Sequence, residues 1–435
     1  MTVADNGSAG RSEDQPQPRP QALSREERAL ADLLQAAHLA APHELPVLFE
    51  RHAAALGVSE VVAFLVDLQQ NVLVPFLPPD GPHDAAQVNS LGVDSTLAGR
   101  SFQLSEPLVQ ERDAGDGRVK VWLPLLNGTE RLGVLAVTVP DADALERDDG
   151  ALLTRLRLFA GVAGELLMTK ALYGDTLVRL RRSAEMGLAA EMQWSLLPPL
   201  TFASSAVTIA GGLEPAYEVA GDSIDYAVDD GIARFAVFDG MGHGMRSAHV
   251  ATLTVGAYRN GRRSNRSLAT TARSIDGAVT AAFAGDAFIT GVLAELDTDS
   301  GILTWINAGH PEPLLLRAGR LVKAVHAEPM LPFGLDAELG ETDDIEIGSE
   351  ALEPGDIVVL YTDGVVEARS PEGAFFGVDR LVDLLVRNLA AGLPAPETMR
   401  RFVRALLDHQ QAQLADDATM VFVQWRPDNQ EALLP

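Results

Sequence analysis

The sequence contains no cysteine among its 435 residues. Disulfide bonds, thiolate metal sites and cysteine nucleophiles are therefore excluded, and the composition is typical of a protein of the reducing cytoplasm. No apolar run reaches the length of about 18 residues that a membrane-spanning helix needs, and the polar, Pro-rich N-terminus lacks the apolar core of a signal peptide. We therefore predict a cytoplasmic protein with no membrane partner.

Basic residues are also scarce. The chain has 34 Lys and Arg against 61 Asp and Glu, which gives a net charge of -27. This charge would repel a phosphate backbone, so we expect no nucleic-acid partner. Most of the acidity is expected to serve solubility, while part of it could form a metal site.

The length favours two or three domains. Residues 1–24 carry Gly, Ser, Gln and Pro without periodic apolar positions, and we predict a disordered tail. In residues 25–164, helical patterns precede apolar runs typical of strands, and two of these runs flank Asn127-Gly128, a hairpin signal. We predict an α+β domain there, which begins with a helix capped by Ser24.

Residues 165–198 are predicted to form a helical linker, because only isolated glycines interrupt the helical pattern from 152 to 197. Four residues recur at a 4-3-4 spacing that is typical of a coiled-coil seam: Tyr173, Leu177, Leu180 and Ala184. The seam could pair with a second copy of the chain and form a homodimer. The alternative is a helix that packs on its own domain.

Residues 199–427 form the second predicted domain, followed by a short tail at 428–435. Apolar runs typical of strands occur at 207–210, 233–238, 291–295, 303–307 and 357–361. Helical patterns lie between and after them, at about 246–259, 267–284, 378–390 and 395–413. Antiparallel sheets with helices on their outer faces would fit this order, so the fold class is α+β.

Four acidic residues of this domain share one context, since each lies at the end of an apolar run and beside Gly or another acid: Asp222, Asp239, Asp363 and Asp416. Each alone is typical of a turn. Together they could converge on one edge, where like charges need a counter-charge, and oxygen ligands favour Mg²⁺ or Mn²⁺. The glycines after Asp239 allow a close approach of the backbone, so the carbonyl of Gly240 could also bind the metal.

The order of seven motifs along residues 190–425 resembles the SpoIIE-like branch of the PPM (type 2C) protein phosphatases. The motifs are Gln193 with Leu196-Leu197-Pro198, and the segments 220–225, 239–244, 307–311, 331–334, 361–367 and 416–419. The resemblance implies an αββα sandwich with two Mn²⁺ or Mg²⁺ ions. The implied ligands are Asp222, Asp239, the Gly240 carbonyl, Asp363 and Asp416, with Asp417 as a neighbouring acid and Asp225 as a supporting one.

The implied reaction is direct attack of metal-activated water on phosphoserine or phosphothreonine, without a phosphoenzyme. The implied substrate is a phosphorylated anti-anti-sigma factor of the STAS type, whose dephosphorylation controls a sigma factor by partner switching. Residues 94–100 and the hairpin that ends at 133–135 resemble a GAF domain, which implies an α/β/α fold for residues 25–164 and a small-molecule ligand. A structural or dimerising role is an equal alternative for this domain.

Three positions depart from the family pattern, the first of which is Ala220, where the group commonly has a Gly before Gly-Asp. Met241 stands where eukaryotic relatives have a His, so the leaving-group acid is unassigned, with His243 and His310 as candidates. Ser247 stands where Ala is commoner, and we interpret it as neutral. Two other functions stay open: a catalytically silent sensor on the same fold, and a metal-dependent hydrolase of small phosphates.

Overall fold

The computed structural model describes residues 24–78, 88–111, 117–214, 217, 221–242, 244–335, 345–411 and 417–427. Asp416, His243 and the predicted tails at 1–23 and 428–435 lie outside the described residues.

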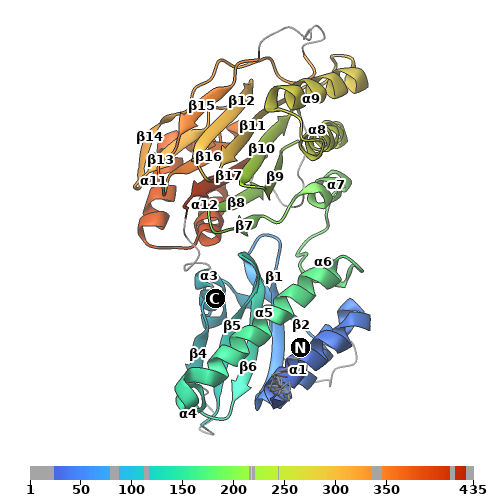
Figure 1. Cartoon of the computed structure of the whole chain (residues 1–435), viewed down its shortest axis with the longest axis vertical. Coiled ribbons are helices and arrows are strands. Elements are labelled where there is room, and N and C mark those ends of the chain that lie inside the picture. Colours follow the sequence, from blue (N-terminus) through green and yellow to red (C-terminus); the bar gives the residue numbers. More distant parts are fainter. Residues whose placement is uncertain are drawn as a thin grey trace, which may run out of the picture.

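The first domain contains a six-stranded antiparallel sheet with the strand order β3-β2-β1-β6-β5-β4 (Figure 1). The predicted hairpin is confirmed, because Asn127 pairs with Glu130 across the turn and Gly128 takes a φ of 57°. The strands are β1 (Ser59–Val66), β2 (Val72–Phe76), β3 (Leu91–Gly92), β4 (Leu108–Glu111), β5 (Val119–Asn127) and β6 (Glu130–Val139).

Helices cover both faces of this sheet, as predicted. One face packs against α1 (Arg25–Leu39), α2 (Leu45–Ala53) and α5 (Ala151–Ala171), and the other packs against α3 (Leu97–Leu104). The short α4 (Asp143–Glu146) precedes α5. The predicted cap is present: Ser24 and Glu27 form a capping box at the start of α1. The GAF resemblance of this domain stays a prediction.

The predicted continuous linker helix is wrong. Three separate helices cover this region: α5, α6 (Thr176–Leu180) and α7 (Leu188–Leu196). Leu177 is buried in the core of the first domain, whereas Tyr173 is 72% exposed in the break before α6. The apolar pattern therefore reflects packing onto the first domain rather than a continuous coiled-coil seam, because a few non-helical residues at each break remove the common face.

The second domain has two antiparallel sheets face to face, which confirms the predicted α+β class and the αββα layering (Figure 1). One sheet has the order β15-β12-β11-β10-β9 and the other has the order β14-β13-β16-β17-β8-β7. The strands are β7 (Thr201–Ala203), β8 (Val207–Glu214), β9 (Ser223–Asp229), β10 (Ile232–Gly240), β11 (Ile289–Asp297), β12 (Ile302–Ala308), β13 (Leu314–Arg317), β14 (Arg320–Ala324), β15 (Gly348–Ala351), β16 (Ile357–Tyr361) and β17 (Ala418–Trp425).

An apolar core fills the space between these sheets, and a helix pair covers each outer face. The helices α8 (Met245–Arg263) and α9 (Leu268–Phe283) pack on the first sheet, through residues such as Phe238 and Tyr258. The helices α11 (Gly377–Ala390) and α12 (Ala395–His409) pack on the second sheet. Across the described residues, no helix has both the length and the apolar character that crossing a bilayer requires.

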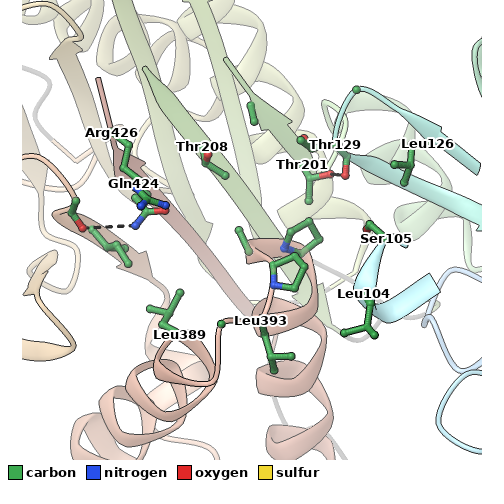
Figure 2. A pocket seen from close by; sticks show the side chains of 18 of the residues that line it. Leu104, Ser105, Leu126, Thr129, Thr201, Thr208, Leu389, Leu393, Gln424 and Arg426 are labelled. Carbon is green, nitrogen blue, oxygen red and sulfur yellow. Dashed lines mark hydrogen bonds between the residues drawn. The ribbon is translucent and has the colours of Figure 1, made fainter. Parts of the chain in front are cut away.

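A cavity of about 1460 Å³ lies between the two domains. Figure 2 shows that Leu104 and Leu126 line it from the first domain, and that Thr208, Leu389 and Arg426 line it from the second. Thr208 lies near the beginning of β8, and Arg426 follows the end of β17. The cavity thus lies at the opposite strand ends from Asp417, which directly precedes β17.

Candidate metal centre

Two of the predicted acids lie at the same end of two neighbouring strands of the first sheet. We call this row of strand ends the edge of the sheet. Asp222 directly precedes β9 and Asp239 is near the end of β10, and the register that pairs Ser223 with Phe238 brings these two acids side by side. Side chains alternate along a strand, so both acids face the space between the sheets, as Ile224 does. Asp222 is 2% exposed.

The second sheet places two further predicted acids at the same edge. Asp363 begins the short helix α10 (Asp363–Val366) just after β16, and Asp417 directly precedes β17. The neighbouring strands are held in register there, because the amide of Thr362 donates to the Thr419 carbonyl at 3.0 Å. Gly364 must be glycine, since a Cβ at this position would lie 1.9 Å from the Asp417 carbonyl oxygen.

Hydrogen bonds through the carboxylates join the two edges. The Thr362 hydroxyl, from the second sheet, donates to Asp222 Oδ2 at 2.8 Å. In the opposite direction, the amide of Gly221 donates to Asp417 Oδ2 at 2.7 Å. Each sheet therefore orients a carboxylate of the other, and this fixes the acids before any ion binds.

Gly240 also reaches this edge. Its amide donates to the Gly221 carbonyl at 3.1 Å, and its own carbonyl accepts a hydrogen bond from the Ser247 hydroxyl at 3.0 Å. The interpretation of Ser247 as neutral is thus wrong, because this buried hydroxyl orients the carbonyl that we predicted as a ligand. The sequence offered one signal for this role, a hydroxyl residue just after the glycine-rich segment.

The acids create a surplus of negative charge. Burial raises the pKa of Asp222 well above its ordinary value, and the charges of Asp239 and Asp417 raise this pKa further. A divalent cation would relieve this repulsion, and donors that are all oxygen suit a hard ion such as Mg²⁺ or Mn²⁺. Within the described part of the chain, no three acidic or histidine side chains form a group that could hold an ion. The fit to a metal thus rests on donor chemistry, with Asp416 outside the described residues.

Asp225 does not belong to this site. Its side chain lies on the other face of β9, where it pairs with Arg259 at 2.9 Å and with Arg262 at 2.7 Å. The supporting role that the family resemblance implied for this acid is wrong, because adjacent strand positions face opposite sides of the sheet.

His310 is buried, and its Nδ1 lies 2.8 Å from the Thr290 hydroxyl. Burial lowers the pKa of His310 to about 4, so the ring is neutral near pH 7 and has no imidazolium proton to give to a leaving group. This result does not favour His310 as the acid. The motif around it has a structural role, because the Asn307 side chain bonds to both the amide and the carbonyl of His310.

The αββα layers and the carboxylates at one edge of both sheets are those expected of the PPM class of phosphatases. Residues 229–426 match the family model Stage II sporulation protein E (SpoIIE). The match to the SpoIIE model thus covers most of the second domain. The matched segment includes all the predicted ligands except Asp222, which precedes it.

Two curated relatives are similar to this chain. Phosphoserine phosphatase RsbU of Bacillus subtilis (strain 168) is 26% identical over 242 residues, which are 55% of this chain and 69% of RsbU. Protein IcfG of Synechocystis sp. (strain ATCC 27184 / PCC 6803 / Kazusa) is 32% identical over 141 residues, which are 31% of this chain. The chain spans only 20% of the length of IcfG.

Two solved structures are also similar. The SiaA-PP2C domain of Pseudomonas aeruginosa has a TM-score of 0.44 at 21% identity, over 54% of this chain and 94% of that one. The RsbU and RsbW domains of a Mycobacterium tuberculosis protein have a TM-score of 0.43 at 23% identity, over 52% of this chain and 62% of that one.

Proposed function

We propose that the chain is a metal-dependent protein serine/threonine phosphatase. The observation that carries this proposal is the position of Asp222, Asp239, Asp363 and Asp417 at the same strand ends of the two facing sheets. The SpoIIE match over most of the same domain supports it. The relative RsbU is named a phosphoserine phosphatase, which favours phosphoserine as the group that is hydrolysed.

Five groups would hold Mn²⁺ or Mg²⁺ most directly: Asp222, Asp239, the Gly240 carbonyl, Asp363 and Asp416, with Asp417 beside them. When bound, two such ions would lower the pKa of water and stabilise charge on the phosphoryl oxygens. The chain itself orients the ligands. Thr362 holds Asp222, the Gly221 amide holds Asp417, and Ser247 holds the Gly240 carbonyl.

Part of the site is accessible to a protein substrate. Asp363 is exposed and Met241 is 44% exposed, whereas Asp222 and Asp417 are buried. The large cavity lies at the opposite strand ends, beside Thr208 and Arg426. A phosphoserine on a protein surface could therefore reach the carboxylates, whereas a small-phosphate hydrolase would need a pocket around its substrate.

The finer proposal is that the substrate is a phosphorylated anti-anti-sigma factor of the STAS type in the cytoplasm. Its dephosphorylation would free it to bind a kinase-like partner and so release a sigma factor. The first domain, with a small-molecule ligand of the GAF kind or as part of a homodimer, would control this activity through α6 and α7.

The test is hydrolysis of p-nitrophenyl phosphate and of a phosphoserine STAS protein, with Mn²⁺, with Mg²⁺ and with excess chelator. We expect metal-dependent hydrolysis of both, and a loss of at least about 100-fold in Asp239→Ala. Asp383→Ala is the matched control, because Asp383 is exposed on the outer helix α11, and it should retain activity.

Folded protein that is inactive with every metal would contradict the proposal and favour the silent sensor. Activity on nucleotides but not on the phosphoprotein would favour the small-phosphate hydrolase.

A further inference from the structure

The contact between the two domains is formed by charges rather than by an apolar core. Each hydrophobic cluster of the described residues belongs to a single domain together with its adjoining linker helix. In contrast, charged residues of the first domain meet the outer helix α12 of the second, as Figure 1 places α3 beneath α12. Interfaces of this kind within a chain allow the domains to separate.

Arg131 of β6 lies at the centre of this contact. Its side chain is 2% exposed, and its Nη1 donates to Glu397 of α12 at 3.0 Å. The same guanidinium stacks on the Phe102 ring and donates to the Gln70 side chain at 3.0 Å. Glu397 is fully buried and also accepts hydrogen bonds from Arg400 and Arg401. Burial acts to raise the pKa of Glu397, but these arginines outweigh it and hold this pKa below its ordinary value.

Asp94 makes the reciprocal contact. This residue begins the segment that resembles a GAF motif, and it accepts a hydrogen bond from Arg400 Nη2 at 2.6 Å. It also pairs with Arg404, one helical turn further along α12. The first domain thus contributes a cation and an anion, and α12 contributes their partners. Arg131, Glu397 and Arg400 are the buried members of this set, and the pairs that join the two domains, Arg131–Glu397 and Asp94–Arg400, form only while the domains are docked.

The contact between the two domains also extends toward the candidate metal centre. The turn between β1 and β2 provides Gln69, whose side chain lies 3.5 Å from Glu214 at the end of β8. Glu214 pairs with Ala418, the residue after Asp417. Helix α12 packs closely on β8, because a Cβ at Gly212 would lie 2.9 Å from Met399 Sδ. After α12 the chain continues through 410–416 to Asp417.

We propose that the first domain docks reversibly on α12 through Asp94, Arg131, Glu397, Arg400 and Arg404, and thereby controls the order of the strand edge that carries Asp417. In the docked state the charges hold α12 against β8. In the open state α12 and the beginning of β17 gain motion. The proposal rests on the proposed phosphatase function, and it names a contact, in addition to α6 and α7, through which the first domain would act.

The experiment uses the absence of native cysteine. Spin labels at Arg157→Cys and Ala390→Cys, on opposite sides of the interdomain cavity, report the separation of the domains in the full chain. Charge reversal by Asp94→Arg or by Arg404→Asp should open the contact, and the double variant should recover at least half of the change. Asp141→Arg is the control, because Asp141 is 40% exposed, like Asp94 at 42%, but pairs with Arg147 inside the first domain.

We expect one narrow distance distribution in the parent and in the control, and a longer, broader one in each single variant. On the same samples, hydrogen exchange in α12 and at residues 417–421 should rise by roughly tenfold or more when the contact opens. Exchange in β10 and β11 should stay unchanged, which distinguishes opening from unfolding.

Unchanged distances after charge reversal would overturn the docking proposal. Longer distances without faster exchange at 417–421 would overturn its link to the metal centre. Both measurements are made without substrate, so an inactive parent would count against the proposed function alone.

Discussion

At the residue scale, the site depends on glycines at positions where another segment of the same chain comes very close. The clearest case is Gly364, beside the Asp417 carbonyl. We expect Gly364→Ala to destabilise the second domain by about 1–3 kcal/mol through overpacking, and to lower turnover by roughly 100-fold through displacement of the carboxylates.

Denaturant unfolding and hydrolysis of p-nitrophenyl phosphate measure the two effects of Gly364→Ala. Gly256→Ala is the control, because a Cβ at this position on α8 meets no atom within 4 Å. This change should leave activity intact and stabilise the helix by about 0.4–1 kcal/mol. Equal behaviour of the two variants would contradict the role of close packing at Gly364.

His310 gives a prediction for pH. Its folded pKa, at about 4, is lower than the ordinary value of 6.5, so the unfolded chain binds a proton at this residue more readily. The stability contributed by the neutral ring is complete above pH 6.5 and is lost as the pH falls toward 4. The free energy of unfolding of the parent should therefore drop by about 2 kcal/mol more than that of His310→Gln between pH 7.5 and pH 5. Urea titrations at both values test this, and parallel losses would refute it.

At the element scale, α7 packs on the second domain through Ala190 and Leu213, and one arginine of α8 also holds it there. Arg259 donates to the Leu196 carbonyl at the end of α7 and to both carboxylate oxygens of Asp225. We expect Arg259→Met to cost about 2–3 kcal/mol, because Asp225 is buried and keeps only Arg262 as a partner. Hydrogen exchange should become faster in α7. Arg263→Met, an exposed change on the same helix, should alter neither quantity, and an unaffected α7 in Arg259→Met would exclude this fastening.

The elements themselves were largely predictable from the sequence. The apolar runs of β8, β10, β11 and β16 and the capping box at Ser24 are local signals, and the structure confirms them. The linker was not predictable, because Leu177 and Tyr173 fit one helical spacing, while only tertiary contacts show that one is buried and the other exposed. The predicted supporting role of Asp225 was wrong for a similar reason, because a motif gives the position of a residue along the chain but not the face of the strand on which its side chain lies.

The acidic residues of the candidate site could be predicted from the sequence, but the hydrogen bonds that orient their carboxylates could not. Strand-end carboxylates could be found one by one from the sequence. The bonds from Thr362 to Asp222 and from Gly221 to Asp417 join segments far apart in the chain, so no local pattern indicates them. The same holds for the charges between the domains, where Arg131 and Glu397 meet across 266 residues.

At the scale of the whole molecule, the separate hydrophobic clusters predict two unfolding transitions. Phe159 belongs to the first domain and Phe422 lies between β17 and the outer helices of the second. Each Phe→Ala change should cost about 3–5 kcal/mol in its own transition and leave the other midpoint nearly unchanged. Calorimetry of the full chain tests this prediction. A single transition that shifts as a unit in both variants would show that the domains unfold together.

The carboxylates come from both sheets of the sandwich, and this has a consequence for folding. An ion held by Asp222 on one side and by Asp363 on the other would act as a cross-link between two layers, in addition to the hydrogen bonds of Asp222 and Asp417. Binding to the folded chain alone adds its free energy to stability. The concentration of free metal ion would therefore determine how stably the two sheets are held together at these strand ends. In the apo protein, local unfolding would begin at the candidate metal centre.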